Sequence, residues 1–336
     1  MKNVDVEKIR VSIGSASVLG LGSALKFKDP PTTCYVMTYT EKNCTANCGF
    51  CSQARTSNSS ESFLSRVSWP EFPFKDFLTK LKYLHFSKKF KRICIQTLNY
   101  SKNFRDLKEI IINIRKNTDI PISVAIPPLP KEELRELKII GVERVGIALD
   151  GASPEIFDKI KGIDVDGPYR WDQHIQKLEE ALEIFSAGFV STHLIIGLGE
   201  SEKDVIELID NLHNSKILIS LFAFTPVKGT KFENLNQPSI LRFRKIQLGR
   251  FLIVSNLKDR KDITFNSKGD IIRFNMSKQE LKNVIDDTDA FLTSGCLGCN
   301  RPYYTSKPSG PIYNYPRELI ESEKKEIYNL LLGLVN

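Results

Sequence analysis

Long apolar segments are missing from this sequence of 336 residues. No run approaches the eighteen or so uncharged apolar residues of a membrane-spanning helix. The first ten residues, Met1 to Arg10, are charged where a secretory signal peptide would be apolar. We therefore expect a cytoplasmic protein with no membrane partner. Hydrophobic residues still make up 41% of the chain, which is enough to bury a substantial core.

Cysteine is also scarce, and its distribution is uneven. The chain has seven cysteines, five of which fall in two short clusters at residues 44–51 and 296–299. Disulfides rarely persist in a reducing compartment, and an odd number of cysteines cannot all pair. The clusters therefore predict metal ligation rather than disulfide bonds.

The charge balance excludes little by itself. The excess of 48 Lys and Arg over 40 Asp and Glu gives a net charge of +8, spread along the whole chain. A solvated lysine-rich surface explains this pattern, and a surface that meets an acidic protein or a nucleic acid is the alternative. An RNA-recognition motif or a basic stripe interleaved with aromatic residues is not visible. A zinc-stabilised nucleic-acid-binding protein therefore remains a rival supported only by charge and cysteine clusters.

Alternating periodicity along the chain predicts an α/β protein. Helical periods are visible at residues 69–86, 101–117, 130–141 and 172–189. Repeated β-then-α units require parallel strands, and no nucleotide-type glycine fingerprint follows the first strand. We therefore expect a parallel β/α barrel, complete or nearly so, with its chemistry at the C-terminal ends of the strands. The expected strands are Cys34–Thr40, Arg92–Leu98, Ile122–Ile126, Arg144–Asp150, Val190–Gly197, Ile217–Thr225 and Asp262–Asn266.

The sequence changes character after Lys278. One amphipathic helix is followed by "SGCLGCNRPYYTSKPSGPIYNYPR", which is rich in Gly, Pro and Tyr, and then by a helix around residues 318–332. So many aromatic residues predict an ordered extension rather than a disordered tail. The expected organisation is a lead-in at 1–32, a barrel at 33–275 and an extension at 276–336.

Three cysteines follow the first expected strand. "NCTANCGFCSQA" spaces Cys44, Cys48 and Cys51 as C-x3-C-x2-C. Three thiolates suit zinc or an iron–sulfur cluster, but a closed zinc site needs a fourth ligand, and no further Cys or His follows closely. A cluster bound by three cysteines keeps one iron open to a small molecule.

This motif, on a barrel and with Phe50 before its last cysteine, resembles the radical S-adenosylmethionine (SAM) superfamily. The resemblance implies that Cys44, Cys48 and Cys51 hold a catalytic 4Fe-4S cluster. The open iron then chelates SAM, whose reductive cleavage yields a 5'-deoxyadenosyl radical, and Phe50 supports the adenine.

Three further segments resemble biotin-synthase-like members, one of them "FTPVKGTKFEN" at the sixth expected strand. In "GIALDGASPEIFDKIKG" the resemblance makes Asp150 the ligand of the SAM ribose, although an Asp before Gly is also a common turn residue. In "STHLIIGLGES" it brings backbone near Gly197 and Gly199 to the adenosine, with Glu200 closing the loop. Biotin synthases hold a second cluster with three strand cysteines, and only Cys94 matches here, which argues against biotin synthase itself.

The second cysteine pair, Cys296 and Cys299, lies in a C-x2-C turn. The pair indicates a metal site without fixing the metal. We expect an auxiliary iron–sulfur cluster, of the 4Fe-4S type, with zinc as the alternative. Cys94 or Cys34 would be the third ligand, and Ser294, Arg301 or substrate could complete the set. The tyrosines expected to line or cover this site are Tyr303, Tyr304, Tyr313 and Tyr315.

A radical SAM site with a second cluster suggests sulfur insertion into an unactivated C–H bond, with the auxiliary cluster as sulfur donor. The tail resembles the C-terminal motif of archaeal two-protein lipoyl synthases. That resemblance implies an octanoyl chain on a lysine of an H-protein or a dihydrolipoyl acyltransferase (E2) lipoyl domain as substrate. It also implies a sister radical SAM subunit and an electron donor such as ferredoxin. A biotin-synthase-like enzyme with another substrate is the rival within the superfamily.

Overall fold

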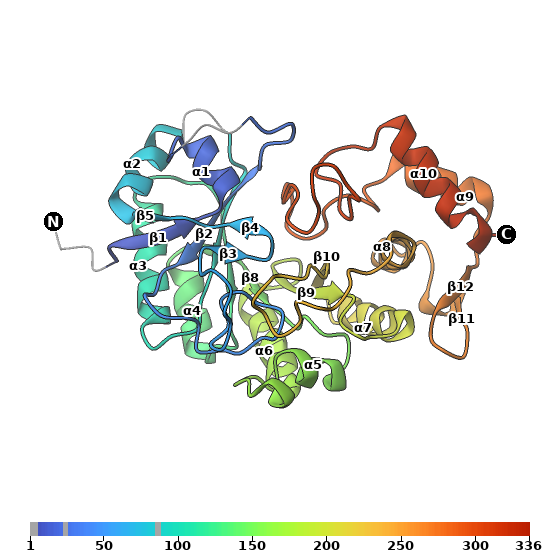
Figure 1. Cartoon of the computed structure of the whole chain (residues 1–336), viewed down its shortest axis with the longest axis horizontal. Helices are drawn as coiled ribbons and strands as arrows, with labels where there is room; N and C mark the ends of the chain where they lie inside the picture. Colours follow the sequence, from blue (N-terminus) through green and yellow to red (C-terminus); the bar gives the residue numbers. More distant parts are fainter. Residues whose placement is uncertain (1–5, 23–25, 85–88) are drawn as a thin grey trace.

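Six parallel strands form the centre of the fold in the computed structural model, which describes residues 6–22, 26–84 and 89–336 (Figure 1). Consecutive strands of this set pair in parallel, in the order in which they follow one another in the chain. Six of the seven expected strands are therefore confirmed, with ends that differ by a few residues. They are β2 (Thr33–Thr38), β6 (Arg92–Gln96), β7 (Ile122–Ile126), β8 (Val142–Ile147), β9 (Val190–Ile196) and β10 (Leu218–Ala223).

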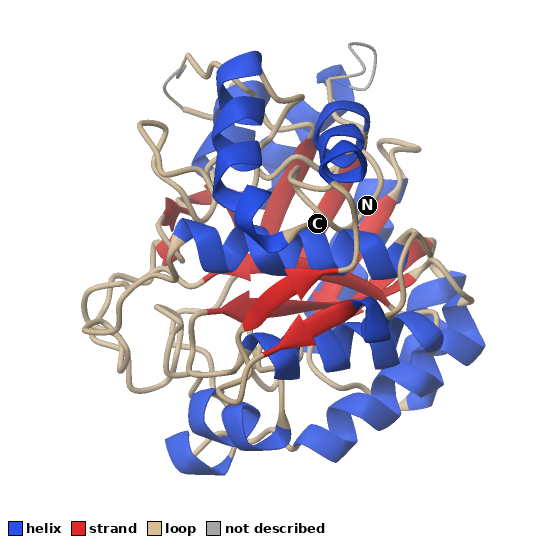
Figure 2. Cartoon of the chain, turned by 90° about the vertical axis from the view of Figure 1, so that its right-hand side faces the viewer, coloured by secondary structure: helices blue, strands red, loops and turns tan. Residues whose placement is uncertain are grey.

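Helices follow these strands and lie outside them (Figure 2). Their buried residues recur every three or four positions, as in α3, where Leu107, Ile110, Ile111 and Ile114 face the sheet. The expected helices are present, but the first one, expected at 69–86, begins only at Phe74. Residues 71–73 form a short strand instead, because Pro70 and Pro73 interrupt the helical pattern, and residues 85–86 lie outside the described residues. The helices after the parallel strands are α3 (Asn103–Arg115), α4 (Lys131–Ile139), α5 (Pro154–Ile160), α6 (Trp171–Phe185), α7 (Glu202–Asn214) and α8 (Ile240–Val254).

The N-terminal part of the chain widens the sheet on the β2 side. β1 (Lys8–Val11) pairs antiparallel with β2, and β5 (Glu71–Pro73) pairs antiparallel with β1. α1 (Ile13–Leu19) packs against β2, and α2 (Phe74–Leu84) against β5. The resulting eight-stranded sheet runs from β10 to β5 without closing. The expected parallel β/α barrel is thus confirmed, as an open one.

The prediction of a seventh barrel strand at Asp262–Asn266 was wrong. Residues 263–265 form β11 (Ile263–Phe265), which pairs antiparallel with β12 (Ile271–Phe274) in a separate two-stranded sheet. The reason is local. The turn between the two strands contains Gly269 at φ +82°, and such a short connection makes a hairpin, whereas a parallel partner needs a long crossover.

The segment between α9 (Lys278–Asp287) and α10 (Glu321–Leu331) spans the open side of the barrel. On one side Leu221 in the edge strand β10 donates its N–H to Ser294 Oγ at 3.0 Å, and Asn314 donates to the Leu221 carbonyl at 3.0 Å. On the other side Arg66, between β3 (Phe63–Leu64) and β4 (Val67–Ser68), donates to the Tyr303 carbonyl at 3.0 Å. The extension therefore hydrogen-bonds to the free edge of β10, where a further strand would otherwise pair.

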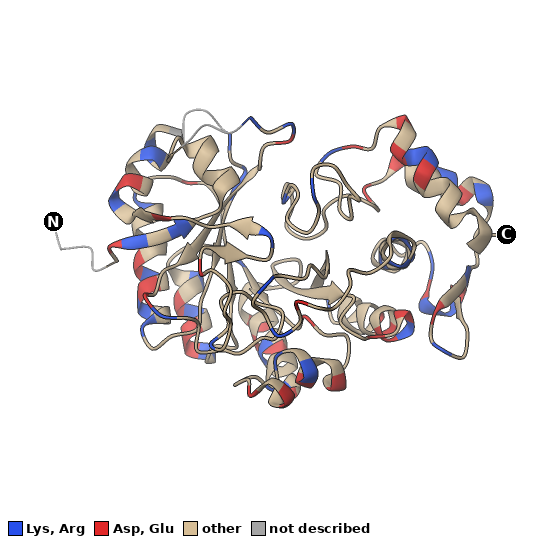
Figure 3. Ribbon diagram, viewed as in Figure 1, with Lys and Arg blue, Asp and Glu red and all other residues tan. Residues whose placement is uncertain are grey.

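Basic and acidic residues are interspersed along the outer helices (Figure 3). This distribution agrees with a solvated charged surface. No helix in the described part of the chain is long and apolar enough to cross a membrane.

Candidate active site

The loop that carries the first three cysteines faces a cavity at the barrel. Cys44, Cys48 and Cys51 line one cavity of about 240 Å³. The same cavity is lined by residues that follow the parallel strands, including Leu98, Pro127 and Thr225. It therefore lies at the C-terminal ends of the strands, where a β/α barrel carries its chemistry.

Backbone hydrogen bonds fix this loop. The Cys51 N–H donates to the Cys48 carbonyl at 3.0 Å, and the Cys44 N–H to the Gln53 carbonyl at 2.9 Å. The loop is also tied to the segment after β6, where the Asn99 N–H donates to Cys44 Sγ at 3.1 Å. The three sulfur atoms are thus presented by a pre-formed loop rather than by a flexible one.

The chemistry of the thiols fits a cluster. Burial raises the pKa of Cys44 and of Cys48, and it raises the pKa of Cys51 to about 12. They are therefore thiols until a metal displaces their protons. In the described ranges, no three His, Cys, Asp or Glu side chains are placed to share a single metal ion. An iron–sulfur cluster binds each thiolate to a different iron, so it does not need that convergence.

A buried ion-pair group lies across the same cavity. Asp150 follows β8 in a left-handed conformation, with φ +62°. Lys161 Nζ donates to Asp150 Oδ2 at 2.7 Å, and His193 Nε2 lies 2.9 Å from Asp150 Oδ1. Burial alone would raise the pKa of Asp150, but Lys161 and His193 outweigh it and hold that pKa well below its usual range. Asp150 is therefore both a turn residue and an ionised cavity residue.

Sequence reasoning missed Lys161 and His193. Both line the cavity, and Lys161 also donates to the Ala148 carbonyl at 2.8 Å. Both residues lie in segments that were recognised by their resemblance to biotin-synthase-like enzymes. A lysine near a helix end is ordinarily exposed, however, and the sequence spacing does not distinguish Lys161 from such an exposed lysine.

The residues that the family resemblance assigns to adenosine lie at or beside the cavity. Phe50 lines it and packs in an apolar cluster with Leu198, Phe224 and Ile160. Gly197 and Gly199 have φ of +109° and +111° and do not themselves line the cavity. The glycine loop thus reaches the site through Leu198, which packs with Phe50.

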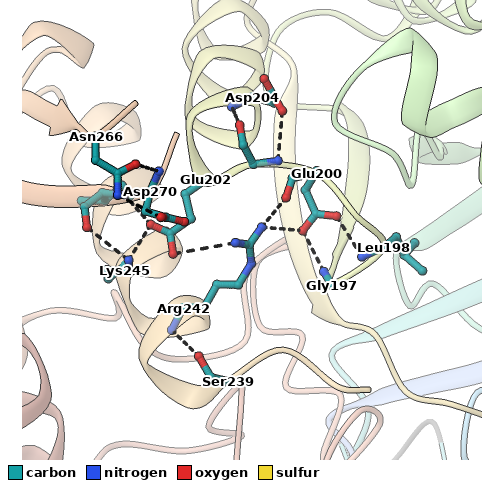
Figure 4. Close-up of polar contacts among 12 residues, drawn as sticks. Gly197, Leu198, Glu200, Glu202, Asp204, Ser239, Arg242, Lys245, Asn266 and Asp270 are labelled. Carbon is teal, nitrogen blue, oxygen red and sulfur yellow. Dashed lines mark hydrogen bonds and ion pairs between the residues drawn. The ribbon is translucent and has the colours of Figure 1, made fainter. Parts of the chain in front are cut away.

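Glu200 closes this loop, as Figure 4 shows. Its buried carboxylate accepts from the Gly197 N–H at 2.8 Å and the Leu198 N–H at 2.9 Å. Arg242 of α8 lies 3.2 Å from the same carboxylate and 4.0 Å from Glu202. Arg242 could not be identified from the sequence, because α8 follows the loop by some forty residues.

A second cavity, of about 100 Å³, lies toward the other end of the strands. It is lined by Cys94 of β6, by Cys296 and Cys299, and by Arg301. Asn300 accepts from the Thr32 N–H at 3.0 Å, and Thr32 immediately precedes β2, so this loop sits at the N-terminal ends of the strands. The fold therefore brings Cys94 together with the pair Cys296 and Cys299, which lies far from it in the sequence.

Hydrogen bonds surround these three sulfur atoms. The Tyr35 hydroxyl lies 3.0 Å from Cys299 Sγ, and Gln96 donates to Cys94 Sγ at 3.1 Å. Ser123 Oγ is 3.6 Å from Cys296 Sγ. Burial raises the pKa of Cys94, and proximity to Cys296 and Cys299 adds to the shift.

Cys34, the alternative third ligand, is placed elsewhere. Side chains alternate along β2, so Tyr35 and Met37 pack toward the cysteines while Cys34 and Val36 pack in the main core. Cys34 is fully buried there and does not line the second cavity. Ser294 does not line that cavity either, because its hydroxyl accepts from β10.

Of the four tyrosines expected at the second site, Tyr304 alone lines it. Tyr303 bonds to Asp29, Tyr313 donates to the Pro238 carbonyl at 2.6 Å, and Tyr315 packs in the main core. The other three therefore fasten the extension to the barrel.

The two cavities adjoin inside the barrel. Both are lined by Gln96, Ala125, Gly146, His193, Phe222 and Tyr304. The two cysteine sets thus line adjoining cavities, and Phe222 and Tyr304 belong to the lining of both.

The sequence model of the radical SAM superfamily matches residues 40–212, and the chain belongs to that family. Membership implies a 4Fe-4S cluster and SAM, which the three-cysteine loop and the neighbouring cavity fit. This protein is therefore a radical SAM enzyme.

Named relatives are biotin synthases. The chain is 28% identical to that of Methanococcus aeolicus over 64% of its own length and 62% of the relative's. It is 27% identical to that of Methanococcus vannielii over 68% of its length and 67% of the relative's. The chain thus spans about two thirds of these relatives.

Solved structures support the same fold. Methylornithine synthase (PylB) superposes with a TM-score of 0.53 at 14% identity, covering 68% of this chain and 64% of that one. The hydrogenase maturase HydG from Carboxydothermus hydrogenoformans gives 0.52 at 22% identity, covering 66% and 51%. At such identities the likeness concerns the fold alone.

Proposed function

We propose that this radical SAM enzyme inserts sulfur into an unactivated C–H bond, with a second iron–sulfur cluster at Cys94, Cys296 and Cys299 as the sulfur source. One observation carries the proposal. The second cysteine set lines a cavity that adjoins the one at Cys44, Cys48 and Cys51. A substrate carbon held where these two cavities adjoin would therefore be near both sites.

Cys44, Cys48 and Cys51 would hold the cluster that supplies the electron for SAM cleavage, and Cys94, Cys296 and Cys299 would hold the cluster that supplies the sulfur. The chain's own residues prepare this chemistry. Ionised Asp150 offers a hydrogen-bond acceptor for the SAM ribose, and Phe50 offers an apolar surface for the adenine. Phe222 and Tyr304 line both cavities and would present aromatic rings to a substrate there.

The proposed substrate is an octanoyl chain on a lysine of an H-protein or an E2 lipoyl domain. Support comes from the resemblance of the tail to archaeal two-protein lipoyl synthases and from the apolar lining by Met37, Leu98 and Phe222. An octanoyl chain has no polar group along its length, so such a lining suits it. A sister radical SAM subunit and a ferredoxin-like electron donor belong to this proposal.

Biotin formation from its sulfur-free precursor is the second candidate. The names of the relatives favour it. Against it, the third and fifth parallel strands offer Ser123 and Ser191 to the second cavity instead of cysteines. The two candidates share the sulfur-insertion step and differ in substrate.

The decisive test is the iron and acid-labile sulfide content of anaerobically reconstituted protein, with Mössbauer spectra. Wild type, a Cys296→Ala/Cys299→Ala double variant and a Cys34→Ala control should be compared. We expect two four-iron clusters in wild type and control, and one in the double variant. One cluster in all three proteins, with zinc at the pair, would contradict sulfur donation.

The substrate is tested next with sulfur isotopes. Protein whose clusters carry ³⁴S should transfer the label to an octanoyl-lysine carrier peptide, assayed beside the biotin precursor. Label in biotin but not in the peptide would favour the second candidate.

A further inference from the structure

A tyrosine hydroxyl contacts one ligand of the second site. Tyr35 stands on β2 and is 8% exposed. Its hydroxyl lies 3.0 Å from Cys299 Sγ and accepts a hydrogen bond from the Arg301 backbone N–H at 3.1 Å. The Tyr35 hydroxyl is thus held between the Cys299 sulfur and the backbone of Arg301 in the same turn.

The direction of the bond to sulfur follows from counting hydrogens. The Arg301 N–H occupies a lone pair of the phenol oxygen and leaves the single O–H hydrogen for another acceptor. Between a phenol and a thiol either atom could donate. Once Cys299 binds iron as a thiolate it has no hydrogen, so only Tyr35 can donate.

We infer that Tyr35 is a positioning residue that donates a hydrogen bond to the Cys299 thiolate and thereby raises the reduction potential of the second cluster. The inference rests on the proposed function, since it needs a cluster at this site. Hydrogen bonds to ligand sulfur withdraw electron density from the cluster and favour its reduced state. A sulfur donor that gains an electron during transfer benefits from such a bond.

The same cavity offers a matched control. Tyr304 also presents a phenol ring there, and its pKa, like that of Tyr35, is raised mainly by burial. Among the described residues its hydroxyl makes no hydrogen bond to a cysteine. Removing it therefore tests the loss of a phenol oxygen near the site without loss of a bond to sulfur.

The experiment compares wild type, Tyr35→Phe and Tyr304→Phe by redox titration followed with electron paramagnetic resonance. The first cluster serves as an internal reference in each sample. We expect the potential of the second cluster to become more negative in Tyr35→Phe alone. An unchanged potential in Tyr35→Phe, or an equal shift in Tyr304→Phe, would overturn the inference.

A second substitution covers the case in which Tyr35→Phe fails to hold its cluster. Incorporation of 3-fluorotyrosine at position 35 keeps the ring and the hydroxyl but makes the hydroxyl a stronger donor. The potential should then move in the positive direction, and no movement would contradict a donor role. A wild-type protein with one cluster refutes the proposed function, whereas two clusters with unmoved potentials refute this inference alone.

Discussion

The two cysteine sites are built in different ways. The first takes all its thiols from eight consecutive residues in a loop held by its own backbone hydrogen bonds. The second takes Cys94 from a barrel strand and its other two thiols from the C-terminal extension. A local motif can be recognised without the fold, whereas a composite site depends on how the chain closes on itself.

The largest expected effect is the loss of activity at the first site while the second site keeps its cluster. Cys48→Ala should reduce SAM cleavage to background, because the open iron is lost with its cluster. The second cluster should remain, since its ligands lie elsewhere. Chromatographic measurement of 5'-deoxyadenosine, with iron content on the same samples, checks this. Loss of both clusters in this variant would mean that the sites are not independent.

The next effect concerns which cysteine completes the second site. Cys94→Ala should lower the iron content from two clusters to one. Cys34→Ala should keep both and cost about 1 kcal/mol of stability, as an ordinary core substitution does. Mössbauer spectra of the two variants, paired with urea titrations, provide the comparison. The opposite result would place Cys34 in the site.

A smaller effect is expected at the glycine loop. Arg242→Ala should weaken SAM binding about tenfold, or roughly 1.4 kcal/mol, because the buried Glu200 carboxylate loses a compensating cation. Cluster content should not change. The surface pair Arg260–Glu207 supplies the control variant Arg260→Ala. Equal SAM affinity in both variants, measured by equilibrium binding, would exclude a role for Arg242.

The smallest expected effect is a loss of folding stability in acid, caused by a histidine that lines the first cavity. Burial lowers the pKa of His174, a cavity residue, to about 3. The unfolded chain binds this proton below about pH 6.5 and the folded chain does not, so stability falls as pH drops below 6.5. The loss from pH 6 to pH 5 should be about 1 kcal/mol.

In urea titrations at pH 6 and pH 5, the His174→Gln variant should not show this loss of folding stability. The partly exposed His213, replaced in the same way, serves as control. If His174→Gln still lost stability between pH 6 and pH 5, another titrating group would be responsible for the acid sensitivity.

The sequence predicted local features well. The six parallel strands were recognised because each is a short β-branched run followed by a helical period. Asp262–Asn266 was misassigned because a strand that turns back after Gly269 has the same composition as a barrel strand. Periodicity identifies a strand but not its partner.

Non-local features were less accessible. The choice between Cys94 and Cys34 depended on which face of its strand each occupies, and that emerges only from the packed barrel. Lys161 and His193 became visible as site residues only once β8 and β9 were side by side. Their identities carry no signal of burial.

The wide separation of Cys94 from Cys296 and Cys299 also orders events during synthesis. The loop at residues 44–51 and the strand that anchors it leave the ribosome early. The second site cannot close until residue 299 has emerged and the extension has docked beside β10. A nascent chain that ends before residue 296 thus lacks two of the three thiols of the proposed sulfur source, so ribosome-bound chains of increasing length should gain the second cluster only after residue 299 has emerged.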